Sequence, residues 1–180
     1  VLVWFRRDLR LSDHPALAHA VDTGLDVIPV FILDDDDLED WCPGAASRWW
    51  LHASLEALQR DLASLGSRLT LRRGQVHSVI ASLVESTKAS GVVWNRCYDP
   101  STLERDATLK KSLHLAGCMA ESFQGSVLFE PWEIRTGSDS PYRVFTPFWR
   151  ACRQKSVAVS VEMPNQLRSV AGKLPGSDDL

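Results

Sequence analysis

Hydrophobic positions along the 180-residue chain follow two alternating spacings. Short apolar runs, typical of buried strands, occupy residues 1–5, 26–32, 69–72 and 91–95, with a weaker run at 119–123. Between them, apolar residues recur at helical spacing over 47–65 and 76–87, which predicts two amphipathic helices. The spacing also becomes helical after Pro15 and after Pro100. The pattern therefore predicts five strands that alternate with four helices.

Residues with special backbone preferences mark the ends of these helices. Asp13, ahead of His14-Pro15, and Asp99, ahead of Pro100, are predicted to be N-caps. Glycines that we predict as C-caps stand before the next strand, at Gly24, Gly66, Gly91 and Gly117. Alternating strands and helices favour right-handed crossovers between parallel strands. We therefore predict a doubly wound, Rossmann-like α/β fold, with a five-stranded parallel sheet and helices on both faces.

The alternation ends near residue 130. We expect 1–130 to form the α/β domain, 131–155 to form an aromatic segment with a short helix, and 156–180 to be a linker. The aromatic residues are Trp132, Tyr142, Phe145, Phe148 and Trp149, and Thr146-Pro147 predicts the start of the helix. Such a segment either covers the sheet edge or docks on another domain. Because the chain starts inside a strand and ends without a pattern, we expect it to be cut from a longer protein.

Composition limits the classes of partner. A hydrophobic fraction of 44% is enough for a core, and a net charge of −3 argues against a purely electrostatic grip on nucleic acid or membrane. No apolar run approaches the length of a transmembrane helix, so we expect no membrane association. The four cysteines, Cys42, Cys97, Cys118 and Cys152, are widely spaced, as in a cytoplasmic protein with reduced thiols.

Polar residues at the predicted strand ends are the candidates for chemistry. Leu33 and Asp34 follow the second strand, and Asn95, Cys97 and Asp99 follow or end the fourth. In open parallel sheets, ligands bind beyond these carboxyl ends. Aromatic walls, carboxylates and an arginine favour a planar heteroaromatic ligand with polar edges over a triphosphate.

Four charged residues, Arg6, Arg7, Asp8 and Arg10, follow the first strand. For Arg6 and Asp8, a structural network and a ligand contact are equally open. The acidic run LDDDDLED at 33–40 lacks the glycine and ligand spacing of a calcium loop, so it predicts a solvated loop and no metal site. The five histidines show no metal-ligand spacing, and the chain has no G-x-G-x-x-G, P-loop or G-x-S-x-G motif.

Three stretches, VWFRRDLRLSDHPAL, WNRCYDPSTLERD and PYRVFTPFWRA, resemble the N-terminal domain of the DNA photolyase and cryptochrome family. The resemblance covers residues 1 to about 155 and is greatest to bacterial deoxyribodipyrimidine photolyases. It implies an antenna pigment on this domain and FAD on a helical domain that follows. It further implies a monomeric carbon–carbon lyase that splits cyclobutane pyrimidine dimers flipped out of UV-damaged DNA. Without the helical domain, these 180 residues are not expected to be catalytic.

Pigment-binding residues carry over by position from deazaflavin-binding relatives. Asp99 matches an acid that lines the pigment, Arg48 matches an arginine at the start of the second helix, and Leu33 and Asp34 match a backbone contact. A second acid expected two residues before Asp99 is Cys97 here, which argues against a deazaflavin.

The folate-binding pattern is also incomplete. Its Asn-Glu pair would fall at Ser101 and Thr102, so the pigment could be a deazaflavin, a flavin, a folate held differently, or none. By the same resemblance, Arg6 and Arg10 pack where the two domains meet, and the aromatic residues at 142–149 dock on the helical domain. Phe148 or Trp149 should then be exposed in this chain.

Two other functions remain open at this point. The same domain occurs in cryptochrome blue-light receptors, which signal and do not repair DNA. A free-standing nucleotide-binding α/β module would need a phosphate-cradling loop, which this chain lacks.

Overall fold

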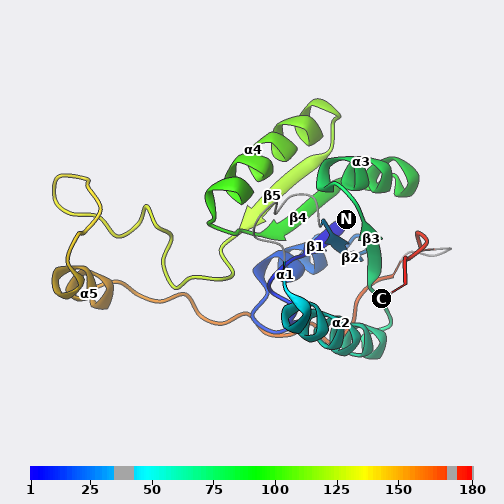
Figure 1. The fold of residues 1–180 in the computed structure, drawn as a ribbon, viewed down its shortest axis with the longest axis horizontal. Helices are drawn as coiled ribbons and strands as arrows, with labels where there is room; N and C mark the ends of the chain where they lie inside the picture. Colours follow the sequence, from blue (N-terminus) through cyan, green and yellow to red (C-terminus); the bar gives the residue numbers. More distant parts are fainter. Residues whose placement is uncertain (35–42, 170–173, 180) are drawn as a thin grey trace. The chain divides into compact units, whose positions relative to one another are not determined.

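The computed structural model describes residues 1–34, 43–169 and 174–179. Its elements, in chain order, are β1 (Leu2–Phe5), α1 (Pro15–Asp22), β2 (Ile28–Leu33), α2 (Ala45–Ser64), β3 (Thr70–Arg73), α3 (Val76–Thr87), β4 (Gly91–Asn95), α4 (Pro100–Leu115), β5 (Met119–Phe123) and α5 (Phe145–Arg153). The predicted alternation of strands and helices is confirmed (Figure 1). The acidic run at 35–40, for which we predicted a solvated loop, lies outside the described residues.

The five strands form one parallel sheet in the order β3-β2-β1-β4-β5. The order reverses between β1 and β4, which is where a doubly wound sheet opens a crevice for ligands. Side chains of β1 alternate between two cores, because successive residues of a strand point to opposite faces. Val3 and Phe5 pack with α1 and α2, and Leu2 and Trp4 pack with α3 and α4. The predicted α/β fold with helices on both faces is confirmed (Figure 1).

Two helices start differently from the prediction. The N-cap of α1 is His14, not Asp13, because His14 Nδ1 accepts a hydrogen bond from Leu17 N at 3.0 Å. Asp13 instead accepts from Val161 N through its carboxylate. Helix α5 begins at Phe145 after Val144, so Thr146 is not its N-cap. Pro147 still lies within the first turn, where no N–H is needed for a helical bond.

The predicted glycine caps hold at Gly24, Gly66 and Gly117, which have positive φ angles. Gly91 is a wrong prediction, because α3 is closed by Lys88 in the left-handed conformation and Gly91 opens β4. A Cβ at Gly91 would lie 2.4 Å from the end of the Met119 side chain. The glycine at this position allows β5 to pack closely on β4, and it does not serve to end a helix.

The chain divides into two compact units, Val1–Gly125 with Val161–Leu180, and Ser126–Ser160. In the first unit, the segment from Val161 adds Leu167 to the core, and its Asp178 N donates to Leu71 O beside the edge strand β3. Of the helices in the described ranges, none has the length and hydropathy to cross a membrane.

The second unit contains α5 and the aromatic residues that precede it. Phe145 stacks on Trp149 with ring centroids 6.3 Å apart, and Tyr142 packs edge-on against Phe148 at the same distance. Phe148 is 37% exposed and Trp149 is 50% exposed. The expectation that one or both would be exposed is confirmed.

Candidate functional site

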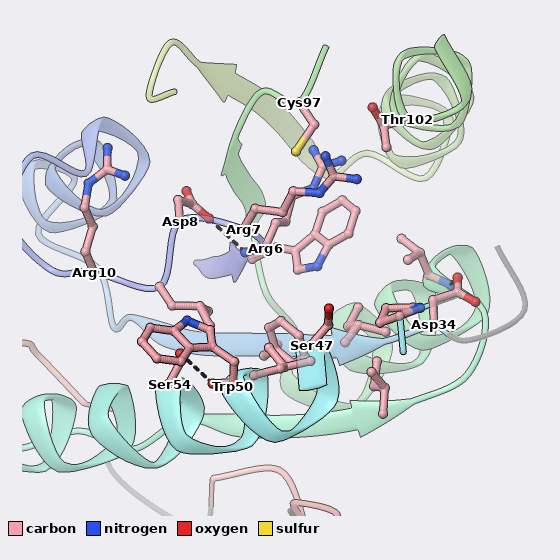
Figure 2. Close-up of a pocket in the computed structure, with 18 of the residues that line it drawn as sticks. Arg6, Arg7, Asp8, Arg10, Asp34, Ser47, Trp50, Ser54, Cys97 and Thr102 are labelled. Atoms are coloured by element: carbon pink, nitrogen blue, oxygen red, sulfur yellow. Dashed lines mark hydrogen bonds between the residues drawn. The ribbon is translucent and has the colours of Figure 1, made fainter. Parts of the chain in front are cut away.

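A cavity of about 570 Å³ opens at the carboxyl ends of β1 and β2, where α2 faces the loops after β1 and β4. Its lining is Trp4, Arg6, Arg7, Asp8, Leu9, Arg10, Phe31, Ile32, Leu33, Asp34, Pro43, Ser47, Trp50, Leu51, Ser54, Val76, Cys97, Thr102 and Arg105. Figure 2 shows Ser47, Trp50 and Ser54 on α2, with the β1 loop and Cys97 on the opposite side. The volume is that of a typical small-molecule site, and the walls combine aromatic and charged side chains.

A buried ion pair holds the loop after β1 in place. Arg6 Nη1 lies 2.6 Å from Asp106 Oδ2 of α4, and both side chains are about nine-tenths buried. Asp106 also accepts from Trp94 Nε1 at 3.0 Å, so one carboxylate ties together β1, β4 and α4. Arg6 is therefore structural. Its ion-pair partner Asp106 belongs to the same compact unit, and the packing of Arg6 where two domains meet stays a prediction of the resemblance.

A second buried network fixes the same loop from the other side. Asp8 accepts from Arg6 N at 2.9 Å and from Asn95 Nδ2 at 2.7 Å, and His14 Nε2 lies 3.0 Å from its Oδ2. Because His14 Nδ1 accepts from Leu17 N, the proton of a neutral His14 is on Nε2, facing Asp8. Asn95 Oδ1 accepts in turn from Ala16 N at 3.1 Å. The network joins the tips of β1 and β4 to the start of α1.

The pKa of Asp8 is lowered in the folded protein. Burial alone would raise this pKa, and the opposing effects of His14, the Arg6 N–H and the Asn95 amide outweigh it. Because its pKa is lowered, the ionised carboxylate of Asp8 stabilises the folded chain. This stabilisation is fully present above the pKa of the unfolded state, about 3.8, and is lost as pH falls through the lower pKa of the folded state.

We therefore expect acid to destabilise the chain partly through Asp8. The free energy of unfolding should fall below about pH 4, and this fall should be shallower in Asp8→Asn, which cannot bind the extra proton. Urea titrations of both proteins between pH 2.5 and 7 measure the two slopes. Parallel curves for the two proteins would show that Asp8 carries no part of the acid sensitivity.

Charged groups at the mouth of the cavity are more exposed. Arg7 pairs with Asp99 at 2.9 Å, and these side chains are 66% and 46% exposed. Arg10 donates to Asp13 O and to Gly125 O. Within the described part of the chain, the partner of Arg7 is the solvent-exposed Asp99, and such pairs contribute little to stability.

Asp34 forms the end of the cavity next to α3. Its Oδ2 accepts from Val76 N at 3.0 Å, which fixes the side chain at the start of that helix. Its Oδ1 has no hydrogen-bond partner within the described ranges. A fixed carboxylate at a cavity edge favours ligands that donate hydrogen bonds.

The thiol of Cys97 lies in the wall beside the β1 loop (Figure 2). Burial raises its pKa, although Arg6 and Arg7 act in the opposite direction. Cys97 is thus protonated at neutral pH and is a polarizable wall residue, not an activated nucleophile. No group of three metal-binding side chains occurs in the part of the chain that the structure describes.

The predicted site residues fall into three groups. Leu33, Asp34 and Cys97 line the large cavity together. Arg48 lines a smaller cavity of about 240 Å³, which Leu33 also borders. Asn95 is 2% exposed and committed to the Asp8 network, and Asp99 is paired with Arg7.

Sequence reasoning missed the cavity residues on α2. Trp50 and Ser47 lie off the leucine face of this helix, and Trp50 is 69% exposed. A signal was present, because two adjacent tryptophans on the polar side of an amphipathic helix are unusual. Thr102, one of the positions of the unmatched folate pair, also borders the cavity.

Comparisons with known proteins agree with this architecture. The family model described as DNA photolyase matches residues 1–166. A deoxyribodipyrimidine photo-lyase of Agrobacterium fabrum is 47% identical to this chain, and the match covers 84% of this chain and 31% of that protein. Cryptochrome-2 of Arabidopsis thaliana is 42% identical, and the match covers 91% of this chain and 26% of that protein. The crystal structure of a bacterial class III photolyase from Agrobacterium tumefaciens superposes with a TM-score of 0.92 at 42% identity, covering 99% of this chain and 36% of that one.

The chain thus spans about a third of the length of these photolyases. The three sequence stretches that carried the resemblance all lie inside the matched range. This chain belongs to the DNA photolyase family.

Proposed function

We propose that this chain is the N-terminal, pigment-binding domain of a photolyase that splits cyclobutane pyrimidine dimers in UV-damaged DNA. The observation that carries the proposal is the cavity at the carboxyl ends of β1 and β2, lined also by the loop after β4, in a chain that is 47% identical to a deoxyribodipyrimidine photo-lyase. In this proposal the catalytic FAD belongs to a helical domain outside these residues. The protein acts in the cytoplasm as a monomer.

The cavity suits a planar antenna pigment. Its volume of about 570 Å³ lies within the range of small-molecule sites. The indole of Trp50 offers an aromatic wall, Asp34 offers a fixed acceptor, and Cys97 offers a polarizable contact. A bound deazaflavin, flavin or folate would absorb near-ultraviolet or blue light and pass the energy to FAD. The chain's own residues would hold the ring and exclude water from it.

We also propose that the segment at 131–155 docks on the helical domain. Its stacked aromatic pair, Phe145 and Trp149, is exposed in this chain and would be covered by the helical domain. The segment 156–180 would then be the linker between the domains. Exposed aromatic side chains of this size are typical of surfaces that bind another protein domain.

We expect Trp50→Ala to weaken pigment binding about tenfold, because loss of one aromatic packing partner costs about 1–1.5 kcal/mol. Folding should be unaffected, since the indole is 69% exposed. Trp49→Ala is the matched control, because Trp49 is equally exposed and does not border the cavity. Fluorescence titration with riboflavin or folic acid measures the affinities. Equal losses for the two variants would contradict the assignment of the cavity.

A cryptochrome receptor is the competing function, because cryptochrome-2 of Arabidopsis thaliana is 42% identical over most of the chain. Light-dependent repair of a thymine-dimer oligonucleotide by the full-length protein separates the two. Repair supports the photolyase, and an inactive protein with photoreducible FAD supports the receptor.

A further inference from the structure

A smaller cavity of about 240 Å³ adjoins the large one at the ends of β2 and β3. The two cavities share four lining residues, Phe31, Leu33, Pro43 and Leu51. They are therefore neighbouring compartments along one edge of the sheet. A ligand whose ring lies in the large compartment could extend a substituent into the small one.

The small compartment has an apolar floor and a charged rim. Leu55 and Leu71 extend the floor beyond the shared residues. Among the described lining residues, three guanidinium groups, those of Arg48, Arg72 and Arg73, stand against two carboxylates, Asp178 and Asp179, and their formal charges sum to +1.

The cations of the rim are not equally engaged. Arg72 Nη1 lies 4.0 Å from Asp178 Oδ1. The other oxygen of Asp178, Oδ2, accepts a hydrogen bond from the backbone N–H of Arg73 at 2.9 Å. Among the residues that the structure describes, Arg48 donates only through its Nε, to Pro43 O. Within the described ranges, neither Arg48 nor Arg73 forms an ion pair. Two guanidinium groups at a concave, partly apolar site favour a phosphate or a carboxylate.

We propose that this small compartment binds an anionic substituent of the pigment, a phosphate or a carboxylate, through Arg48 and Arg73. The inference rests on the proposed function, because it assigns a second part of the same ligand. It selects a class of pigment: a ring that carries an acidic side chain binds more tightly than the same ring without one.

The carboxyl-terminal segment competes with this anion. Asp178 is held by Arg73 N, Ser177 Oγ accepts from Leu71 N, and Asp178 N donates to Leu71 O, so the segment lies along β3 and brings Asp179 to the rim. The carboxylate of Asp179 repels an incoming anion. Its removal in Asp179→Asn strengthens binding of the anionic ligand about threefold.

The experiment uses two pairs of probes on the purified chain. Riboflavin and FMN share a ring and differ by a phosphate, and pteroic acid and folic acid differ by the glutamate, which adds a carboxylate. For each ring that binds, the more anionic member should bind about tenfold more tightly at low salt. Arg48→Gln and Arg73→Gln should each abolish this preference, bringing the affinity for FMN down to that for riboflavin, which carries no anionic group. Arg60→Gln, an exposed position further along α2, is the control.

The outcomes separate the two levels of the proposal. If a ring binds but its two members bind equally, the anionic subsite is wrong and the pigment cavity stands. If the preference survives in Arg48→Gln and Arg73→Gln and is lost in Arg7→Gln, the anion lies in the large cavity, and the subsite is again wrong. If none of the four probes binds at millimolar concentration, the subsite is wrong for flavins and folates, and the proposed pigment cavity fails for both of these classes.

Discussion

Asp106→Ala is expected to destabilise the chain by about 3–5 kcal/mol, because it leaves the buried guanidinium of Arg6 without a counter-ion. Arg6 is 9% exposed, and its Nη1 contacts Asp106 at 2.6 Å. The substitution also removes the hydrogen-bond acceptor of Trp94 Nε1–H, and this donor is buried as well. For a chain of this size the loss corresponds to a fall in Tm of about 10 °C.

Asp99→Ala is the matched control for this prediction. It also removes an aspartate that pairs with an arginine of the β1 loop, but that pair is solvent-exposed. We expect it to cost less than about 1 kcal/mol. Urea unfolding of both variants gives the comparison. Similar losses would mean that burial of the Arg6–Asp106 pair has no energetic consequence, and would contradict the account of the loop.

Gly125→Ala is expected to cost about 2 kcal/mol, through overpacking against Asn95. A Cβ at Gly125 would lie 2.5 Å from Asn95 Cγ and 2.6 Å from Nδ2. Asn95 cannot turn aside, because its amide donates to Asp8 and accepts from Ala16 N. The clash therefore reaches the network that positions the β1 and β4 tips.

Gly137→Ala provides the control, because nothing lies within 4 Å of a Cβ there. It should change the free energy of unfolding by less than about 0.5 kcal/mol. A double-mutant cycle with Asn95→Ala tests the cause, since this variant removes the Cγ and Nδ2 contacts and leaves only the 2.8 Å approach to the Asn95 Cβ, so Gly125→Ala should cost less in that background. Additive losses in the cycle would show that the cost arises elsewhere.

Much of the fold could be predicted from the sequence, because hydrophobic spacing reports how each element packs. The run at 91–95 is continuously apolar up to Asn95 because β4 is covered on both faces. Three residues of the large cavity, Leu33, Asp34 and Cys97, were predicted as ligand contacts from the positions of the strand ends. Leu33 ends β2, Asp34 follows it and Cys97 follows β4, and the carboxyl ends of parallel strands meet at one edge of the sheet.

The sequence does not show contacts between distant residues, and these contacts decide the role of several side chains. Asn95 stands at a strand tip as a ligand contact would, but its amide is bound by Asp8 and Ala16 N, from other elements. Arg6 and Asp106 are a hundred positions apart, so no local pattern links them. Trp50 required knowledge of which helix face meets the β1 loop, and the leucine spacing defines only the face that packs on the sheet.

The most direct test of the central claim is an absorption spectrum of the purified chain, with mass analysis of any molecule released on denaturation. The pigment-binding account predicts a near-ultraviolet or blue band and a releasable deazaflavin, flavin or folate. It also predicts that the band is regained when the stripped protein is mixed with that pigment. A colourless protein that binds none of the three classes on reconstitution would contradict the assignment of the cavity as a pigment site.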